Sequence, residues 1–304
     1  MNRKLVQQGA ATLMVSLPSK WIKQFNLKKG DEISIEEVEN SLLISKESKK
    51  EKKKVNLNLT NYTESAIRTG IINSYRSGVD IIEINFKDES QYKIILNTIN
   101  NYLIGFDVIK KEKNICIIEN ITEPSEEQFD VLFRKILYNI SLLINGTEAR
   151  LKEESKFEDY EEIVLSIHKY DNFCRRVISK QNTFGNESKL FWTFSGILIH
   201  GQRELYHLNK FLDKNKVNFK NFEFFSHLKK AFDLLSQGYV QKNISKLEEL
   251  HELEKKIIYS DFYKLIQTNK KENIVLYHLA VAIKDFYLAS SPLVGLLLSS
   301  NNSK

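Results

Sequence analysis

The sequence predicts a multidomain protein in which a small β-rich N-terminal module precedes a two-layer α/β domain and an all-α region. Three observations support this prediction. Apolar and polar residues alternate in the first 45 residues, strand-like and helix-like segments take turns over residues 55–122, and only the helical period recurs from Pro124 onward. A chain of 304 residues is long enough for two or three domains.

Residues 1–46 are predicted to form a strand, a short helix and a hairpin of two further strands. The segment TLMVSLP alternates and ends at Pro18, and Ser19 is expected to cap the helix. Gly30 is expected to take a positive φ in a tight turn, and the hairpin is expected to turn at Glu39-Asn40. So short a module exposes too much apolar surface to be stable alone, so we expect two copies to interleave their strands.

The charged segment 47–54 is predicted to be a linker, and residues 55–122 to be a small α/β domain. VNLNL and VDIIEINF alternate as strands, and each precedes an amphipathic segment that stops at a glycine, Gly78 or Gly105. The segment FDVIKKEKNICIIENI is predicted to close as a hairpin. This order of elements is typical of a sheet covered by helices.

Residues 123–304 are predicted to be helical throughout. A capping box begins at Ser125, and the first helix is expected to end at Asn145-Gly146. Residues 203–206 (Arg-Glu-Leu-Tyr) resemble residues 284–287 (Lys-Asp-Phe-Tyr), which favours two similar three-helix units. Further helices are expected near 148–181, 187–213, 219–242, 244–268 and 272–299.

Composition is ordinary for a soluble globular protein, with 42% apolar and 28% charged residues. Cys116 and Cys174 fit no metal-ligand spacing, so we expect two buried thiols in a reducing cytoplasm. The longest apolar stretch, LASSPLVGLLLSS, is too short to span a bilayer. We therefore expect a buried helix there and no insertion into a membrane.

Positive charge is concentrated at the N-terminal end of the chain. The net charge is +6, and residues 1–54 alone contain 12 basic and 7 acidic residues. Such an excess favours an acidic partner, most simply nucleic acid. Part of the excess lies in KESKKEKKK (46–54), which is also typical of a solvated linker.

The segment QQGAATLMVSLPSKWIKQFNLKKGDEISIEEVENSLLIS (7–45) resembles the SpoVT/AbrB-type swapped-hairpin DNA-binding domain. The version with VSLPSKW is similar to the N-terminal domain of archaeal PhoU-like phosphate uptake regulators, and SYRSGVDIIEI and GFDVI resemble the next segment of that family. The resemblance implies an AbrB-like swapped-hairpin β-barrel, an α/β domain and a PhoU-like pair of three-helix bundles. The residues that carry the N-terminal resemblance are Gly9, Thr12, Val15, Leu17, Pro18, Lys20, Trp21, Leu27, Gly30, Asp31 and Leu43.

The resemblance also implies a function: a homodimeric, DNA-binding transcription regulator of phosphate uptake or phosphate response, with a helical sensor or adaptor region. Lysine and arginine would neutralise phosphates of double-stranded DNA, and glutamine and arginine can reach base edges. The expected contacts are Arg3, Lys4, Gln7, Gln8, Thr12, Lys20 and Lys23. The sequence has no phosphate-cradling glycine loop, nucleophile elbow or HExxH motif, so we expect no catalytic residue and no enzyme.

Two alternatives remain open for this architecture. The helical region could be an adaptor that contacts a phosphate transporter ATPase or a histidine kinase, while the N-terminal module only dimerises. Related modules also occur in antitoxins, which bind DNA and a toxin, but the long C-terminal region argues against a simple antitoxin.

PhoU-like domains often carry repeated acid-x-x-x-acid motifs that collect metal ions, because carboxylates four residues apart share one helix face. This sequence departs from that pattern, since Leu208 stands four residues after Glu204 and Ala289 four residues after Asp285. We therefore expect no cofactor. The weak candidates for binding a metal ion are Asp171, His200, Glu204, His207, Glu252 and Asp285.

Overall fold

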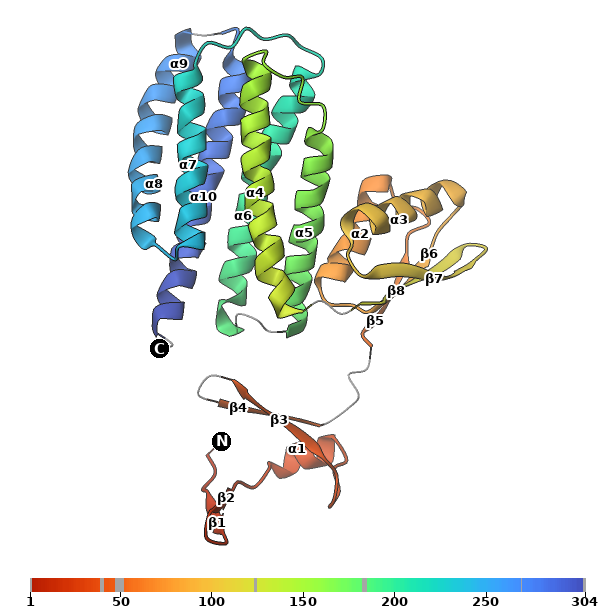
Figure 1. Ribbon diagram of the computed structural model, residues 1–304. Helices are drawn as coiled ribbons and strands as arrows, with labels where there is room; N and C mark the ends of the chain where they lie inside the picture. The colour runs from red at the N-terminus through yellow and green to blue at the C-terminus, as the bar shows by residue number, and fades with distance from the viewer. Residues whose placement is uncertain are drawn as a thin grey trace. The chain divides into compact units, whose positions relative to one another are not determined.

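The computed structural model describes residues 2–38, 41–46, 52–122, 125–181, 185–268 and 270–302. The chain divides into two compact units, Met1–Glu51 and Lys52–Lys304. The α/β domain and the helical region, which the sequence suggests as separate domains, therefore form one unit. Figure 1 shows the helices and strands of both units.

The N-terminal unit contains two hairpins and a short helix. Strands β1 (Val6–Gln8) and β2 (Thr12–Met14) are antiparallel, as are β3 (Ile33–Val38) and β4 (Ser41–Lys46). Helix α1 (Ser19–Gln24) lies between the hairpins in sequence. Strand β1 is an addition to the predicted order, and β2 is shorter than the predicted strand.

The turn at Gly30 and the start of α1 are two points at which the structure tests the predicted N-terminal module. Gly30 takes φ +97°, as the tight turn requires. The prediction that Ser19 caps α1 is wrong: Pro18 occupies the N-cap position, and no side chain caps this end. A proline is suited to that end of a helix, because it lacks the N–H that would need a partner. The predicted turn residues Glu39-Asn40 lie outside the described residues.

The predicted linker, residues 47–54, extends too far toward the C-terminus. Strand β5 (Lys54–Asn58) begins at Lys54, and Lys52 forms an ion pair with Glu119 in the same unit. Lys54 is paired with Glu83 at 2.6 Å. These lysines therefore belong to the second unit, while residues 47–51 lie outside the described residues.

The α/β part of the second unit is a four-stranded sheet with two helices. The strand order is β5-β6-β8-β7, with β5 parallel to β6 and the other neighbours antiparallel. The alternation of the strands buries Ile82, Ile84 and Ile118, which pack in one core with helix residues such as Ile71 and Ile95. The remaining elements are α2 (Glu64–Arg76), β6 (Ile81–Asn85), α3 (Glu89–Tyr102), β7 (Phe106–Glu112) and β8 (Ile115–Asn120).

The helical part of the second unit follows the predicted pattern in most places. One hydrophobic core runs through all of its long helices, from Phe129 to Leu297. The predicted helix near 244–268 is interrupted by a π-helical turn, Ile257–Phe262. The helices are α4 (Glu126–Leu151), α5 (Tyr160–Gln181), α6 (Ser188–Leu212), α7 (Phe222–Val240), α8 (Ile244–Lys256), α9 (Tyr263–Thr268) and α10 (Asn273–Asn302), and a 3-10 turn covers Gly185–Glu187.

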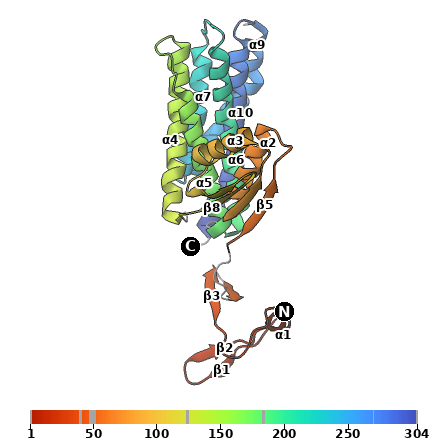
Figure 2. The same cartoon turned by 90° about the vertical axis from the view of Figure 1, so that its right-hand side faces the viewer.

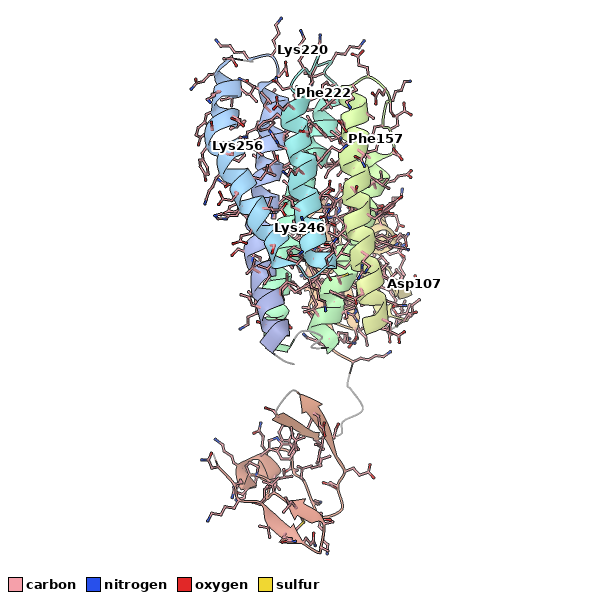
Figure 3. All side chains as sticks on the ribbon, turned by 60° about the vertical axis from the view of Figure 1, so that its left-hand side comes forward. Asp107, Phe157, Lys220, Phe222, Lys246 and Lys256 are labelled. Carbon is pink, nitrogen blue, oxygen red and sulfur yellow. The ribbon has the colours of Figure 1, made fainter. Side chains whose placement is uncertain are left out.

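Helix α4 begins as predicted but does not end as predicted. Ser125 and Gln128 form the reciprocal capping box. The helix then runs through Asn145-Gly146 to Leu151. Gly146 is instead a point of close packing against Phe157, whose position beside α4 can be followed in Figure 3.

Helix α10 is apolar along most of its length. By length and composition residues Asn273–Ser299 could cross a membrane, a test that the core helix of a soluble bundle also passes. In this structure α10 packs mainly along α6 and α7 and buries residues such as Leu279, Ile283 and Phe286. This burial agrees with the prediction of a buried helix over the apolar stretch.

Candidate nucleic-acid interface

The described residues of the N-terminal unit form no hydrophobic core of their own. Among its described residues none is buried, and five large apolar side chains are more than half exposed: Leu5, Val6, Leu13, Ile35 and Leu42, at 56–64%. Burying a side chain of this size contributes about 1.5–3 kcal/mol, a contribution that a single copy forgoes. The unit therefore presents apolar surface that needs a partner.

The register of the first hairpin sorts the candidate DNA contacts. Gln8 pairs with Thr12, and Gln7 pairs with Leu13. Directly paired residues share one face of a hairpin and successive residues alternate, so Gln8 and Thr12 lie together and Gln7 lies on the other face. The structure thus brings the predicted contacts Gln8 and Thr12 together on one face and places Gln7 on the opposite face.

The remaining candidates lie on two other segments, and all seven side chains are exposed. Arg3 and Lys4 precede β1, while Lys20 and Lys23 lie three residues apart on α1. On the same helix Trp21 is half-buried and its ring lies 5.4 Å from that of Phe25. The basic side chains of α1 are therefore exposed to solvent, while Trp21 is half-buried beside the ring of Phe25.

Charge is distributed unevenly within the N-terminal unit. Residues 1–30 contain six basic and no acidic residues, whereas residues 31–51 contain three basic and seven acidic ones. The three lysines that follow belong to the second unit, so the excess of the N-terminal unit is smaller than the first 54 residues suggest. The candidate interface is accordingly confined to the segment before β1, to β1, β2 and α1, and to the segments that join them.

A second set of polar contacts, which sequence reasoning missed, lies where α5 meets α2 and α3. Lys169 Nζ donates to Asn100 O at 2.8 Å, and Asn172 Nδ2 donates to Tyr102 O at 2.9 Å. The last carbonyls of a helix lack partners within the helix and carry partial negative charge. Helix α5 thus caps the C-terminal end of α3, and Figures 1 and 2 show the α/β part beside α5.

Arg176 extends the same row of donors to the end of α2. It is fully buried, and its Nη1 donates to Tyr75 O at 3.1 Å and to Val79 O at 2.6 Å. Its guanidinium lies over the rings of Tyr75 and Phe106, with centroid distances of 5.1 and 4.8 Å. Such stacking suits the planar, weakly hydrated guanidinium. The sequence signal is the spacing of Lys169, Asn172 and Arg176, which places all three on one face of α5.

Asp171 is a structural residue in the same region, where α5 meets α2. Its buried carboxylate accepts hydrogen bonds from Arg76 at 3.0 Å, from Arg175 at 2.9 Å and from Ser195 Oγ. These contacts join α2, α5 and α6. Two guanidinium groups and a hydroxyl occupy the oxygen atoms that a metal ion would need.

The metal candidates His200, Glu204 and Asp285 lie on α6 and α10, where they have charged or polar neighbours. Glu204 Oε2 lies 2.8 Å from His278 Nδ1. Burial raises the pKa of Asp285, while the nearby His200 opposes this rise. Glu204, His278, Asp285 and His200 lie along the contact between α6 and α10. In the described structure they do not form a set of metal ligands.

The last two metal candidates lie apart at the surface. Glu252 is paired with Lys255 at 3.1 Å, and His207 is exposed beside Tyr206. In the part of the chain that the structure describes, no group of three or more His, Cys, Asp or Glu side chains could hold a metal ion.

Comparison with known proteins bears on the N-terminal unit. Residues 6–52 match the family model described as antidote-toxin recognition MazE, bacterial antitoxin. No curated protein and no solved structure matches the chain. The matched residues cover both hairpins and α1, so the N-terminal module is similar to a MazE/AbrB-type domain, in agreement with the predicted swapped-hairpin resemblance.

Proposed function

We propose that this chain is a DNA-binding regulator that acts as a homodimer through its N-terminal unit. The observation that carries the proposal is the absence of any buried side chain among the described residues of that unit, although it contains apolar strands. Two copies that interleave these strands would bury the apolar faces together. The similarity to MazE/AbrB-type domains, which typically dimerise and bind DNA, supports the same arrangement.

The proposed contact surface consists of the acid-free first 30 residues of both copies. Twelve basic side chains would then line one dimer, because each copy contributes six from this segment. Arg3, Lys4, Lys20 and Lys23 would neutralise phosphates, and the paired Gln8 and Thr12 would face the duplex as one set of polar groups. Gln7 would contact DNA only if its face of the hairpin also turned toward the duplex.

The finer parts of the proposal rest on sequence resemblance. We propose a cytoplasmic protein without enzymatic activity or a resident cofactor, whose helical region is PhoU-like and senses or relays a phosphate-related signal. A transporter ATPase or a histidine kinase is the partner that this reading implies. A chain that dimerises and ignores DNA would favour the adaptor alternative.

A second candidate is recognition of a toxin, because the matched family is described by that activity. In that case a protein toxin would bind the chain, and DNA binding could accompany it. DNA binding alone does not separate the two candidates, because an antitoxin that also binds operators would pass the same test. Binding of a protein toxin would distinguish them.

The test is the affinity of the full chain for duplex DNA by fluorescence anisotropy at 50 and 200 mM salt. A dimer with 6–10 phosphate contacts should lose roughly 10³-fold or more in affinity over this range, because bound lysines displace condensed cations. Lys4→Ala combined with Lys20→Ala should weaken binding and make the salt dependence shallower. Lys54→Ala is the matched control, since Lys54 is paired with Glu83 in the second unit. No retention of DNA at 50 mM salt, or equal affinities for all three proteins, would contradict the proposal.

A further inference from the structure

Positive charge is in excess where helices α2, α5 and α6 meet. Helix α5 contacts both of the other helices, and α2 lies beside it in Figure 1. Arg76 comes from the last turn of α2, Arg175 from α5 and Arg203 from α6. Within the described part of the chain, the ion pairs of these three arginines involve one carboxylate, that of Asp171.

Asp171 holds two of the guanidinium groups in place. Its carboxylate accepts hydrogen bonds from Arg76 Nη2 at 3.0 Å and from Arg175 Nε at 2.9 Å. Arg76 Nε also donates to Asn172 Oδ1 at 2.7 Å, and the guanidinium of Arg175 lies 4.8 Å from the centre of the Trp192 ring. Both cations are therefore fixed in orientation before any ligand binds, which lowers the entropic cost of binding.

Arg203 approaches the same region from α6. Ser195, which donates to Asp171, lies eight residues earlier on the same side of α6. Burial is the main cause of the lowered pKa of Arg76 and of His168, and the charge of Arg203 adds to both decreases, so its guanidinium lies near both groups. In the described structure Arg203 is exposed, and its side chain forms no hydrogen bond or ion pair.

The balance of charge at this junction favours an anionic ligand. Arg175 is 6% exposed and Arg76 is 24% exposed, so solvent screens these charges less than it screens charges on an open surface. Asp171 offsets one of the three positive charges, which leaves two for a doubly charged anion to neutralise. Guanidinium groups suit a phosphate-type oxyanion, because their planar donors match its oxygen atoms.

We propose that Arg76, Arg175 and Arg203 bind a phosphate-class oxyanion where α2, α5 and α6 meet. Each arginine belongs to a different helix, so the bound ion joins all three helices. His168 lines the site, since it lies three residues before Asp171 on the same face of α5. The recessed position of Arg175 favours a small ion or a single phosphate group over a polymer.

The site gives the proposed phosphate-related signal a place to bind, and this link alone rests on the proposed function. Helix α2 belongs to the α/β part of the second unit, and α6 belongs to its helical part. A bound oxyanion would therefore strengthen the contact between these two parts. Binding of the ion itself requires neither DNA nor a second copy of the chain.

The experiment is equilibrium dialysis of the full chain against radiolabelled inorganic phosphate, with sodium chloride holding the ionic strength constant. We expect the wild type to retain roughly one phosphate per chain at about 10 mM ligand. Arg203→Gln removes a charge that forms no ion pair in the described structure, and it should weaken binding roughly tenfold through the loss of a charge-assisted hydrogen bond. Lys230→Gln is the matched control, because it removes an exposed charge from α7, which packs against α4, α8 and α10, and it should bind phosphate like the wild type.

Competition with glycerol 3-phosphate distinguishes two sources of the phosphate group. Tighter binding than that of the free ion assigns the site to the phosphate group of a larger molecule, and weaker binding assigns it to inorganic phosphate. Two results overturn the site: no retention of phosphate by the wild type, or equal affinities of the wild type and Arg203→Gln. A chain that binds phosphate and ignores DNA would refute the proposed function and leave the site standing, whereas DNA binding without phosphate binding would do the reverse.

Discussion

Gly146 on helix α4 lies against the ring of Phe157, so that a Cβ at Gly146 would lie 2.2 Å from Phe157 Cε2. Phe157 follows the helix and has φ +50°, a conformation that is unusual for a bulky residue. The ring can cover the helix only because Gly146 has no side chain. This glycine permits a close approach and does not end the helix.

Gly146→Ala should destabilise the second unit by about 2 kcal/mol or more, because the methyl group overlaps a buried ring that has little room to move. Chemical denaturation of the full chain, followed by circular dichroism, measures the change. Gly70→Ala on α2 is the control: the nearest atom to its Cβ is Leu59 Cδ2 at 3.8 Å, an ordinary contact. That variant should be neutral or more stable by up to about 1 kcal/mol. Equal effects of both substitutions would contradict this packing.

Gln202→Met should stabilise the bundle. Gln202 is fully buried on α6, and neither its Oε1 nor its Nε2 has a hydrogen-bond partner within the described protein. An unpaired buried amide costs about 1–3 kcal/mol, and methionine has a similar shape without that cost. We expect the melting temperature to rise by several degrees. A fall would show that the amide has a partner, such as a buried water molecule.

Asn209→Leu provides the opposite case on the same helix. Asn209 is also buried, but its Nδ2 donates to Thr147 Oγ1 at 2.7 Å and to Leu205 O at 2.9 Å. Replacement by leucine leaves Thr147 without this partner, so a loss of about 1–3 kcal/mol is expected. Gln202→Met should raise the stability of the bundle and Asn209→Leu should lower it. These opposite changes distinguish the loss of a hydrogen bond from a general effect of hydrophobic substitution.

His168 should make the second unit less stable in mild acid. Burial lowers the pKa of His168 from 6.5 to about 4, an effect that Asp171 partly offsets and Arg203 reinforces. Because the pKa is depressed in the folded state, the unfolded chain binds the proton more tightly between pH 6.5 and 4. Stability contributed by neutral His168 is therefore present at pH 7 and is lost as the pH falls through this window.

His168→Gln removes this titration. Between pH 7 and 4.5 the wild type should lose about 2 kcal/mol more than the variant in its free energy of unfolding. Urea titrations at both pH values give the difference, in which the shared titration of the carboxyl groups cancels. If both proteins lose the same free energy of unfolding, then the pKa of His168 is not lowered in the folded state.

Leu13→Asp should disrupt dimerisation. Leu13 is 63% exposed on the first hairpin, on a face that a second copy would cover in the proposed dimer. A buried carboxylate there would have no partner. Tyr138→Asp on α4 is a matched control, because Tyr138 is also 63% exposed but lies outside the N-terminal unit. Analytical ultracentrifugation should show dissociation of the first variant alone, and identical behaviour of both would argue against the interface.

Much of the fold of the second unit could be predicted from the sequence because most of its helices and strands bury one face. The alternation of VNLNL and VDIIEINF specifies paired strands, and the stops at Gly78 and Gly105 coincide with positive φ values of +78° and +77°. The start of α4 at Ser125 was predictable for a similar reason, since a capping box satisfies its own backbone groups locally.

The contacts of α5 could not be predicted in the same way. Lys169, Asn172 and Arg176 resemble the ordinary polar face of a helix. Their function depends on which carbonyl groups meet them, and those carbonyls belong to helix ends some 70–100 residues away. The structural role of Asp171, one of the metal candidates, could not be predicted for the same reason, because its partner Arg76 lies on another helix. Local spacing does not specify such tertiary partners.

The mass of the full chain in solution tests the central claim most directly, because the proposed DNA-binding function requires two copies of the N-terminal unit. One chain has a mass of 35.5 kDa, so light scattering coupled to size-exclusion chromatography at micromolar concentration should give twice that value. A stable species of 35.5 kDa with a folded N-terminal unit would contradict the account, since the described residues of that unit provide no core for a single copy.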